Sequence, residues 1–292
     1  MPTVKALRER IRSLKNTQQI TKAMKQVAAA RIRRAEQAQK EARPYADTLA
    51  EMLRDLMAAV AAIDHPFMKP GSASAPTGVI LMTADKGLAG AFNSNVIRAG
   101  ELYARDQKNN VAWYTVGVKA RNAIRRLGQG DRPTWPVNAP SKLEVARDVA
   151  ARVSDDFVSG KISEIVLIRS KLVSMLSQKP EVRQLVPITR EDLAAGNEAE
   201  KSGPKGAVEF APSPEFVLSR LLPKYLEFTI FSAILETDAA FFAAQLLAMS
   251  NATDNAGKLI DELTIQMNNA RQAAITKELL EIVGGAEALV NG

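Results

Sequence analysis

Residues 251–286 read NATDNAGKLIDELTIQMNNARQAAITKELLEIVGGA, and this stretch decides the fold. It contains no proline, and neither does the sequence before it as far back as Lys224, so one helix can run through all of it. Apolar and small residues recur there at alternating spacings of three and four, which is the heptad pattern of a coiled-coil seam. The predicted seam consists of Leu246, Met249, Thr253, Ala256, Ile260, Leu263, Met267, Ala270 and Ala274.

The length of this helix is its second informative property. From Lys224 to an expected stop at Gly284 and Gly285 it would measure roughly 90 Å. A compact protein of 292 residues would be only about 50 Å across. The sequence therefore predicts a helix that projects from a globular body, as in shafts, tethers and spacers.

Composition excludes several classes of site. The chain has no cysteine, which excludes disulfides, thiolate nucleophiles and Cys-type metal sites. Its one histidine, His65, allows no two-histidine metal site and is expected to face solvent beside Pro66. We therefore expect no metal and no cofactor. The longest nearly apolar run, Ala239–Met249, is too short to span a bilayer, so no transmembrane segment is expected.

The N-terminal region predicts a second long helix. Thr3–Arg43 lacks glycine and proline, and heptad spacing runs through Val4, Leu7, Ile11 and Leu14 before drifting to Ile20, Met24 and Val27. Pro44 should kink this helix or lie at a locally loosened turn, and the helical spacing resumes over Asp47–Ile63. The first 43 residues carry twelve basic and three acidic side chains, although the whole chain has a net charge of only +7. The helical pattern continues past any cleavage-like site, so no targeting peptide is evident.

The middle of the chain alternates short strands with short helices. Strands are expected over residues 79–83, 111–116, 162–169 and 182–188, with 173–176 as a further candidate, and a capping box at Ser141 and Glu144 starts one of the helices. This alternation predicts a largely parallel, Rossmann-like sheet. The C-terminal helical region should open at Ser213, Pro214 and Glu215.

The predicted fold class is α/β plus coiled coil. Two long helices with narrow apolar seams can bury them against each other as an antiparallel coiled coil, into which the α/β domain is inserted. The close approach of the two backbones is favoured by the small residues of the seam and by Gly257. The expected segments are an N-terminal helical segment at 1–65, a linker at 66–77, the α/β domain at 78–211 and a C-terminal helix at 212–292.

Two candidate binding sites have ordinary structural explanations. The loop Thr83–Gly90 follows a strand and precedes a helix, where open α/β sheets bind phosphates, but it lacks both the G-x-G-x-x-G and the G-K-[ST] patterns. A tight strand-to-helix turn is the favoured interpretation. Asp155 and Asp156 are adjacent helical positions that do not face one another. The basic N-terminal helix could bind nucleic acid, although residues 1–43 hold no aromatic side chain for base stacking. A solvated helix face, or one that contacts an acidic protein surface, explains these charges at least as well.

Three motifs resemble the gamma subunit of F-type ATP synthases. They are residues 16–29 (NTQQITKAMKQVAA), residues 85–90 (DKGLAG), and at the C-terminal end residues 253–256 (TDNA) with 270–278 (ARQAAITKE). The resemblance covers both ends and the centre of the chain, in order, over nearly the full length.

The resemblance implies a noncatalytic rotor. In that family the coiled coil is a shaft inside the α3β3 ring, the α/β domain packs with the epsilon subunit at the foot, and the foot sits on the c-ring at the cytoplasmic face of the bacterial inner membrane. Rotation couples proton flow to ATP synthesis, and the nucleotide sites belong to the partners. Met24, Arg271, Gln272 and Thr276 match positions where the family's shaft touches the β subunits' moving loop and the sleeve of the ring. The competing hypotheses are a basic coiled-coil protein that binds nucleic acid or acts as a scaffold, and a nucleotide-dependent enzyme of the middle domain.

Some positions depart from the family pattern. Ala240 and Phe241 stand where a Ser-Glu pair is usual, Gln245 replaces a familiar arginine, and Met267-Asn268-Asn269 replaces a segment beginning Tyr-Asn. These departures leave the seam intact. We expect Phe241 and Phe242 to serve helix packing.

Overall fold

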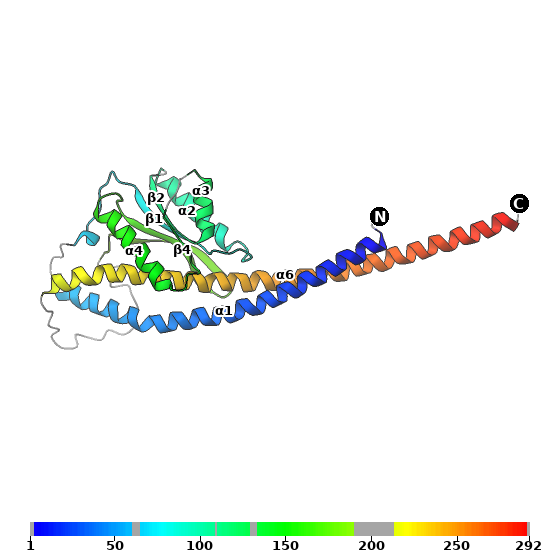
Figure 1. Ribbon diagram of the computed structural model, residues 1–292, viewed down its shortest axis with the longest axis horizontal. Helices are drawn as coiled ribbons and strands as arrows, with labels where there is room; N and C mark the ends of the chain where they lie inside the picture. The colour runs from blue at the N-terminus through cyan, green and yellow to red at the C-terminus, as the bar shows by residue number, and fades with distance from the viewer. Residues whose placement is uncertain (1–2, 60–64, 109, 129–132, 190–212, 291–292) are drawn as a thin grey trace. The chain divides into compact units, whose positions relative to one another are not determined.

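The computed structural model describes residues 3–59, 65–108, 110–128, 133–189 and 213–290 (Figure 1). The chain forms two compact units, one made of residues 1–28 and 246–292 and the other of residues 29–245. Two long helices, α1 (Val4–Ala59) and α6 (Pro214–Val290), contribute residues to both units.

The first unit is an antiparallel pair of helices. Gln18 Nε2 donates to the carbonyl oxygen of Thr253 at 3.4 Å, and Lys25 Nζ donates to Ser250 Oγ at 3.0 Å. Along α1 from Gln18 to Lys25 the residue numbers rise, whereas those of their partners on α6 fall from Thr253 to Ser250. The two helices therefore run in opposite directions, which confirms the predicted coiled-coil arrangement. A Cβ on Gly257 would lie 3.1 Å from Gln18 Nε2, so the tight approach at this glycine involves a side chain of α1.

The ends of α6 were predicted with unequal success. Its start is as expected, because Pro214 is the first helical residue and Ser213 Oγ accepts the N–H of Phe216 at 3.3 Å. The expected stop at Gly284 and Gly285 is wrong, since α6 continues to Val290. Glycine disfavours a helix by about 1 kcal/mol per residue without forbidding it, and the alanines and leucine that follow favour the helix. Pro44 lies within α1, and the helix continues past it to Ala59.

The second unit contains a five-stranded sheet in the order β3-β2-β1-β4-β5. Its strands are β1 (Thr77–Met82), β2 (Val111–Val116), β3 (Thr134–Trp135), β4 (Ile165–Ser174) and β5 (Ser177–Val186). The pairs β1–β2, β1–β4 and β2–β3 are parallel, as predicted. β4 and β5 instead form an antiparallel hairpin. Residues 173–176, expected as a possible further strand, are the end of β4 and the turn of this hairpin. The two-residue β3 was not predicted.

Helices cover both faces of this sheet. On one face α2 (Phe92–Asp106) and α3 (Val118–Arg126) pack on Val79, Leu81, Trp113 and Ile168. On the other face α4 (Lys142–Val158) and the parts of α1 and α6 in this unit pack on the alternate residues Ile80, Met82, Tyr114 and Leu167. We term the sheet with α2, α3 and α4 the α/β domain; Figure 1 shows it in cyan and green.

The stretch before the sheet is more ordered than a simple linker. A short 3-10 helix, η1 (Pro66–Met68), carries the buried Phe67, and Gly71 N donates to Ser163 O at 3.1 Å. His65 does not simply face solvent as predicted. It is half-buried, its Nδ1 accepts the N–H of Phe67 at 3.1 Å, and burial lowers its pKa. The segment boundaries at 65/66, 77/78 and 211/212 stay predictions.

The aromatic pair on α6 serves packing within the second unit. Phe241 and Phe242 are both buried, and the ring of Phe241 lies 5.7 Å from that of Phe92. The guanidinium carbon of Arg31 lies 5.3 Å from the centre of the Phe242 ring, a cation–π arrangement. These contacts support the interpretation of Phe241 and Phe242 as packing residues.

Candidate functional site

Three of the four predicted contact residues lie together on α6. Arg271, Gln272 and Thr276 are all exposed, and Thr276 Oγ1 donates to the carbonyl oxygen of Gln272 at 3.0 Å. Met24 is half-buried on α1. It pairs in register with residues near Ser250, roughly 30 Å along α6 from Arg271. The structure therefore presents two separate candidate contact regions on the coiled coil.

The predicted seam residues differ in burial along α6. Met249, Ala256 and Ile260 are buried, and Leu246, Thr253, Leu263, Met267 and Ala270 are half-buried. Ala274 is exposed. Thr21 lies opposite Thr253, and in this register Val4, the first residue of α1, lies opposite about residue 270. Ala274 therefore lies past the N-terminal end of α1 and has no residue of α1 opposite it. Their joint role as a seam stays a prediction.

From Arg271 to Ala286 every residue of α6 is exposed. Figure 1 shows this part of α6 in red, continuing alone beyond the N-terminal end of α1. Five large apolar side chains are among the exposed residues: Ile275, Leu279, Leu280, Ile282 and Val283. An uncovered apolar helix is typical of a surface that another protein covers.

Sequence analysis missed a polar layer between α1 and α6. Thr253 Oγ1 donates to Thr21 Oγ1 at 2.8 Å, next to the bonds from Gln18 and Lys25 already described. The predicted drift of the seam to Ile20 and Val27 is wrong, because these side chains are 60% and 53% exposed. The spacing of Leu7, Ile11 and Leu14 continues to Gln18 and Thr21, and it would have identified this layer if polar residues of α1 had been admitted to the seam.

The loop after β1 uses its polar groups within the fold. Asp85 Oδ1 accepts the N–H of Val118 at 3.0 Å, and Oδ2 accepts that of Asn138 at 2.8 Å. Thr83 Oγ1 accepts the N–H of Ala120 at 2.7 Å. The carboxylate of Asp85 therefore occupies the N-terminal end of α3, where a helix would otherwise bind an anion. This geometry favours the structural turn over a phosphate site.

The two adjacent aspartates of α4, Asp155 and Asp156, differ in their exposure to solvent. Asp155 is exposed, whereas Asp156 is buried and accepts hydrogen bonds from Tyr114 Oη at 2.8 Å and Arg152 Nε at 2.9 Å. Burial alone would raise the pKa of Asp156, but the bonds from Tyr114 and Lys161 and the charge of Arg152 lower it. Asp156 is thus a charged structural anchor, and the pair offers no acid–base site.

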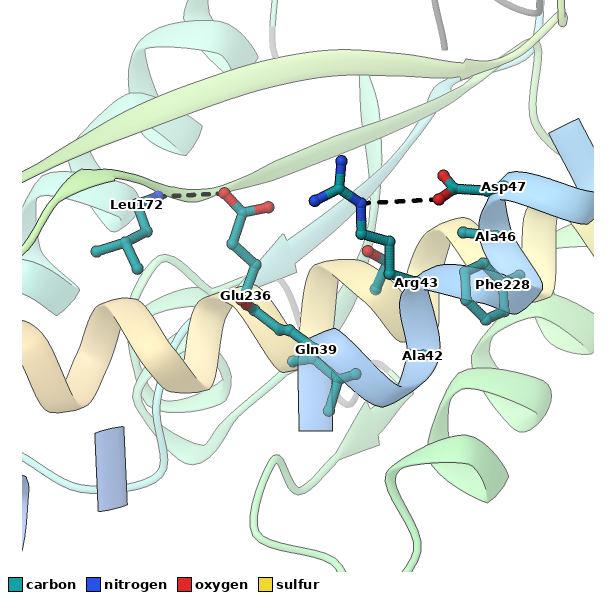
Figure 2. Close-up of a pocket in the computed structure, with 10 residues that line it drawn as sticks. Gln39, Ala42, Arg43, Ala46, Asp47, Leu172, Phe228 and Glu236 are labelled. Atoms are coloured by element: carbon teal, nitrogen blue, oxygen red, sulfur yellow. Dashed lines mark hydrogen bonds and ion pairs between the residues drawn. The ribbon is translucent and has the colours of Figure 1, made fainter. Parts of the chain in front are cut away.

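A cavity of about 340 Å³ opens between α1, α6 and the β4–β5 hairpin (Figure 2). Its charged groups have partners: Arg43 Nε lies 3.7 Å from Asp47 Oδ2, and Glu236 Oε1 accepts the N–H of Leu172 at 3.2 Å. Ala42, Ala46 and Phe228 form apolar parts of the wall. Across the described ranges, no group of three or more histidines and carboxylates could hold a metal ion.

Within the part of the chain that the structure describes, one helix meets the length and hydropathy of a membrane span. It is α6, with a mean hydropathy of 1.4 over its most apolar 18-residue window. Of that window, 67% is buried inside the protein. Packing in the core therefore accounts for the apolar character of this segment.

Comparison with known proteins gives consistent matches along the chain. A family model described as ATP synthase matches residues 3–289. The ATP synthase gamma chain of Heliobacterium modesticaldum is 41% identical over 99% of this chain and 100% of its own length, and that of Phenylobacterium zucineum is 43% identical with the same coverage. Among solved structures, a chain of the Euglena gracilis mitochondrial ATP synthase (OSCP/F1/c-ring) aligns with a TM-score of 0.67 at 19% identity, covering 98% of this chain and 94% of that one.

Proposed function

Because this chain belongs to the gamma-chain family of ATP synthases, we propose that it is the central-stalk rotor subunit of a proton-translocating F-type ATP synthase. In this role it transmits torque between a membrane c-ring and a catalytic α3β3 ring, and so couples proton flow to ATP synthesis. The α/β domain is the foot of the rotor, and the paired helices α1 and α6 are its shaft.

The observation that carries this proposal is the uncovered end of α6. Residues 271–286 combine exposed polar side chains with five large exposed apolar ones. Such a helix is costly to leave in water and gains free energy when a partner surrounds it. A ring of subunits around the shaft would cover it on all sides. Arg271, Gln272, Thr276 and Met24 would then contact the sleeve of the ring and the moving loops of the β subunits.

The proposed partners are the α and β subunits, an epsilon subunit and the c-ring. Solved structures of similar fold come from assemblies titled central stalk/c-ring and OSCP/F1/c-ring, which supports this set. The complex would lie at the cytoplasmic face of a bacterial inner membrane, and this chain would contact the membrane only through the complex.

We propose that the chain itself is noncatalytic. The loop at Asp85 lacks the G-K-[ST] arrangement of lysine and hydroxyl that a phosphate-binding loop needs, and the Asp85 carboxylate already accepts backbone N–H groups. The nucleotide sites would therefore belong to the partners, and this chain would bind no cofactor.

Purification of the endogenous protein tests the proposal. The rotor should co-purify with a large ATPase that contains α, β and epsilon subunits, visible as one assembly by native mass spectrometry, whereas the isolated chain should show no ATP turnover. Co-purification with nucleic acid would instead favour the basic scaffold hypothesis. Turnover by the isolated chain that disappears in Asp85→Ala would contradict the noncatalytic role.

A further inference from the structure

Three ion pairs join α6 to the α/β domain, and all have the same polarity. The acids Glu227, Glu236 and Asp238 lie on α6. Their partners are Arg147 and Lys142 of α4 and Arg169 of β4. Within the described residues, α6 therefore presents carboxylates to a domain that presents cations. All six residues belong to the second unit.

The pairs hold α6 from two sides. At 3.6 residues per turn, Glu227 and Asp238 point within about 20° of each other around the helix, whereas Glu236 points about 180° from Glu227. The first two acids contact α4, and Glu236 contacts the β4–β5 hairpin. Attachments on nearly opposite sides of a helix resist its rotation about its own axis, because turning it would pull against both at once.

Glu236 and the β4–β5 hairpin are joined by more interactions than either acid that contacts α4. Glu236 is paired with Arg169 through one oxygen, and its other oxygen accepts the N–H of Leu172 at 3.2 Å. Arg169 is only 7% exposed and also lies 3.0 Å from Glu181 on β5. Burial would raise the pKa of Glu181, but the charges of Arg169 and Lys171 lower it, so Glu181 remains ionised. One buried arginine thus links both strands of the hairpin to α6.

Apolar packing alone would hold α6 less specifically. Leu222, Leu226 and Ile230 bury against the core, but hydrophobic attraction has no direction and tolerates small displacements. Ion pairs with hydrogen-bond geometry fix position along and around the helix. We propose that Glu227, Glu236 and Asp238, with Arg147, Arg169 and Lys142, form a clamp that locks α6 to the α/β domain against rotation, so that torque passes between domain and shaft without slip. This inference rests on the proposed rotor function.

The test uses charge reversal in the complete F1Fo complex. Among the described residues, Lys142 and Asp238 form an ion pair only with each other, so Lys142→Asp and Asp238→Lys each create repulsion, and the double swap restores attraction. Glu41→Lys is the matched control for Asp238→Lys, because it makes the same charge change of an acid to a lysine at an exposed position of α1. The measurements are ATP hydrolysis by detached F1, and ATP-driven proton pumping in vesicles per ATP hydrolysed.

A clamp predicts a specific pattern. Detached F1 bears no load from the c-ring, so hydrolysis in each single variant should stay within about twofold of the wild type. Pumping per ATP should fall several-fold, most strongly against a preformed proton gradient, and the swap should restore it to within about twofold. The control should pump as the wild type does. If the single variants do not assemble, Lys142→Met combined with Asp238→Asn removes the charges while keeping size, and the same loss of pumping is expected.

Normal pumping per ATP in the assembled single variants, or in the neutral pair, would overturn the clamp. So would a loss of hydrolysis and pumping in equal proportion, because that is the result of a merely structural role. Failure of the wild-type chain to enter a proton-pumping ATPase would instead overturn the proposed function, so the two failures are distinguishable.

Discussion

Two isoleucines on α6 differ in burial and provide a first test at the scale of single residues. Ile260 is 9% exposed in the coiled coil, whereas Ile265 is 62% exposed. Ile260→Ala should lower the free energy of unfolding by about 2 to 5 kcal/mol, since it removes buried methylenes and leaves a cavity. Ile265→Ala should change it by no more than about 0.5 kcal/mol. Denaturant unfolding followed by circular dichroism measures both, and equal effects would contradict the seam register.

Two glycines should respond oppositely to alanine. Gly117, at the start of α3, has φ of +100°, and a Cβ there would lie 2.2 Å from the carbonyl oxygen of Thr83. Gly117→Ala should therefore destabilise the α/β domain by more than about 1 kcal/mol. Gly284 lies in α6 with open space around it, so Gly284→Ala should raise helix stability by up to about 1 kcal/mol. The measurement is thermal unfolding of the isolated chain. A stable Gly117→Ala protein would contradict the described turn.

The buried carboxylate of Asp156 predicts a pH dependence of stability. Its pKa is lowered in the fold from an ordinary value of 3.8, so the stability it contributes is present above that value and is lost as pH falls through the lower, folded pKa. Asp156→Asn should cost about 1 to 3 kcal/mol near neutral pH, because it leaves Tyr114 and Arg152 with a weaker acceptor. The difference between variant and wild type should begin to shrink below about pH 5 and continue to shrink as pH falls through the lowered pKa of Asp156. A constant difference would show that Asp156 is not ionised in the fold.

At the scale of elements, the sequence predicts those helices and strands whose residues follow a repeating pattern. The heptad spacing of α6 and the alternation of strands and helices identified both long helices and the parallel part of the sheet. A strand at 182–188 was expected, but the antiparallel direction of β5 was not, because the residues of a strand do not show its pairing direction, which depends on the chain between strands. The polar layer at Gln18 and Thr21 was missed because only apolar residues were sought at the seam positions of α1, although Thr253 was included on α6.

The candidate site was less predictable from residue patterns than the fold. Arg271, Gln272 and Thr276 are ordinary exposed helix residues, and only the family resemblance singled them out. The clamp acids Glu227, Glu236 and Asp238 carry no local motif either, because their basic partners lie about 70 to 100 residues away in sequence. Contacts of this kind become visible only when the tertiary structure brings the elements together.

The exposed end of α6 yields a prediction for this element. Changing both Gln272 and Thr276 to Ala should leave the stability of the isolated chain within about 0.5 kcal/mol, since both side chains are exposed and the Thr276 hydroxyl bonds only to its own helix. ATP synthesis by the assembled enzyme should fall, because these side chains would no longer reach the surrounding ring. The assays are circular dichroism and proton-driven ATP synthesis in vesicles. Early unfolding with normal coupling would make these residues internal packing instead.

At the scale of the whole molecule, charge and composition suit a subunit that works inside an assembly. Basic residues concentrate in the first 43 residues of the chain, most of which belong to α1. The clamp would unite the α/β domain with α6, and the uncovered end of α6 would engage the ring. The absence of cysteine also has a practical use, because one introduced cysteine is a unique attachment point.

Rotation of single complexes tests the central claim most directly. Arg125 is exposed on α3, so Arg125→Cys can carry a bead while the β subunits are fixed to a surface. With ATP present, the account predicts that the bead turns in one direction and pauses at three positions per revolution, as a threefold catalytic ring requires. A bead that stays fixed while the same complexes hydrolyse ATP would contradict the assignment of this chain as the rotor.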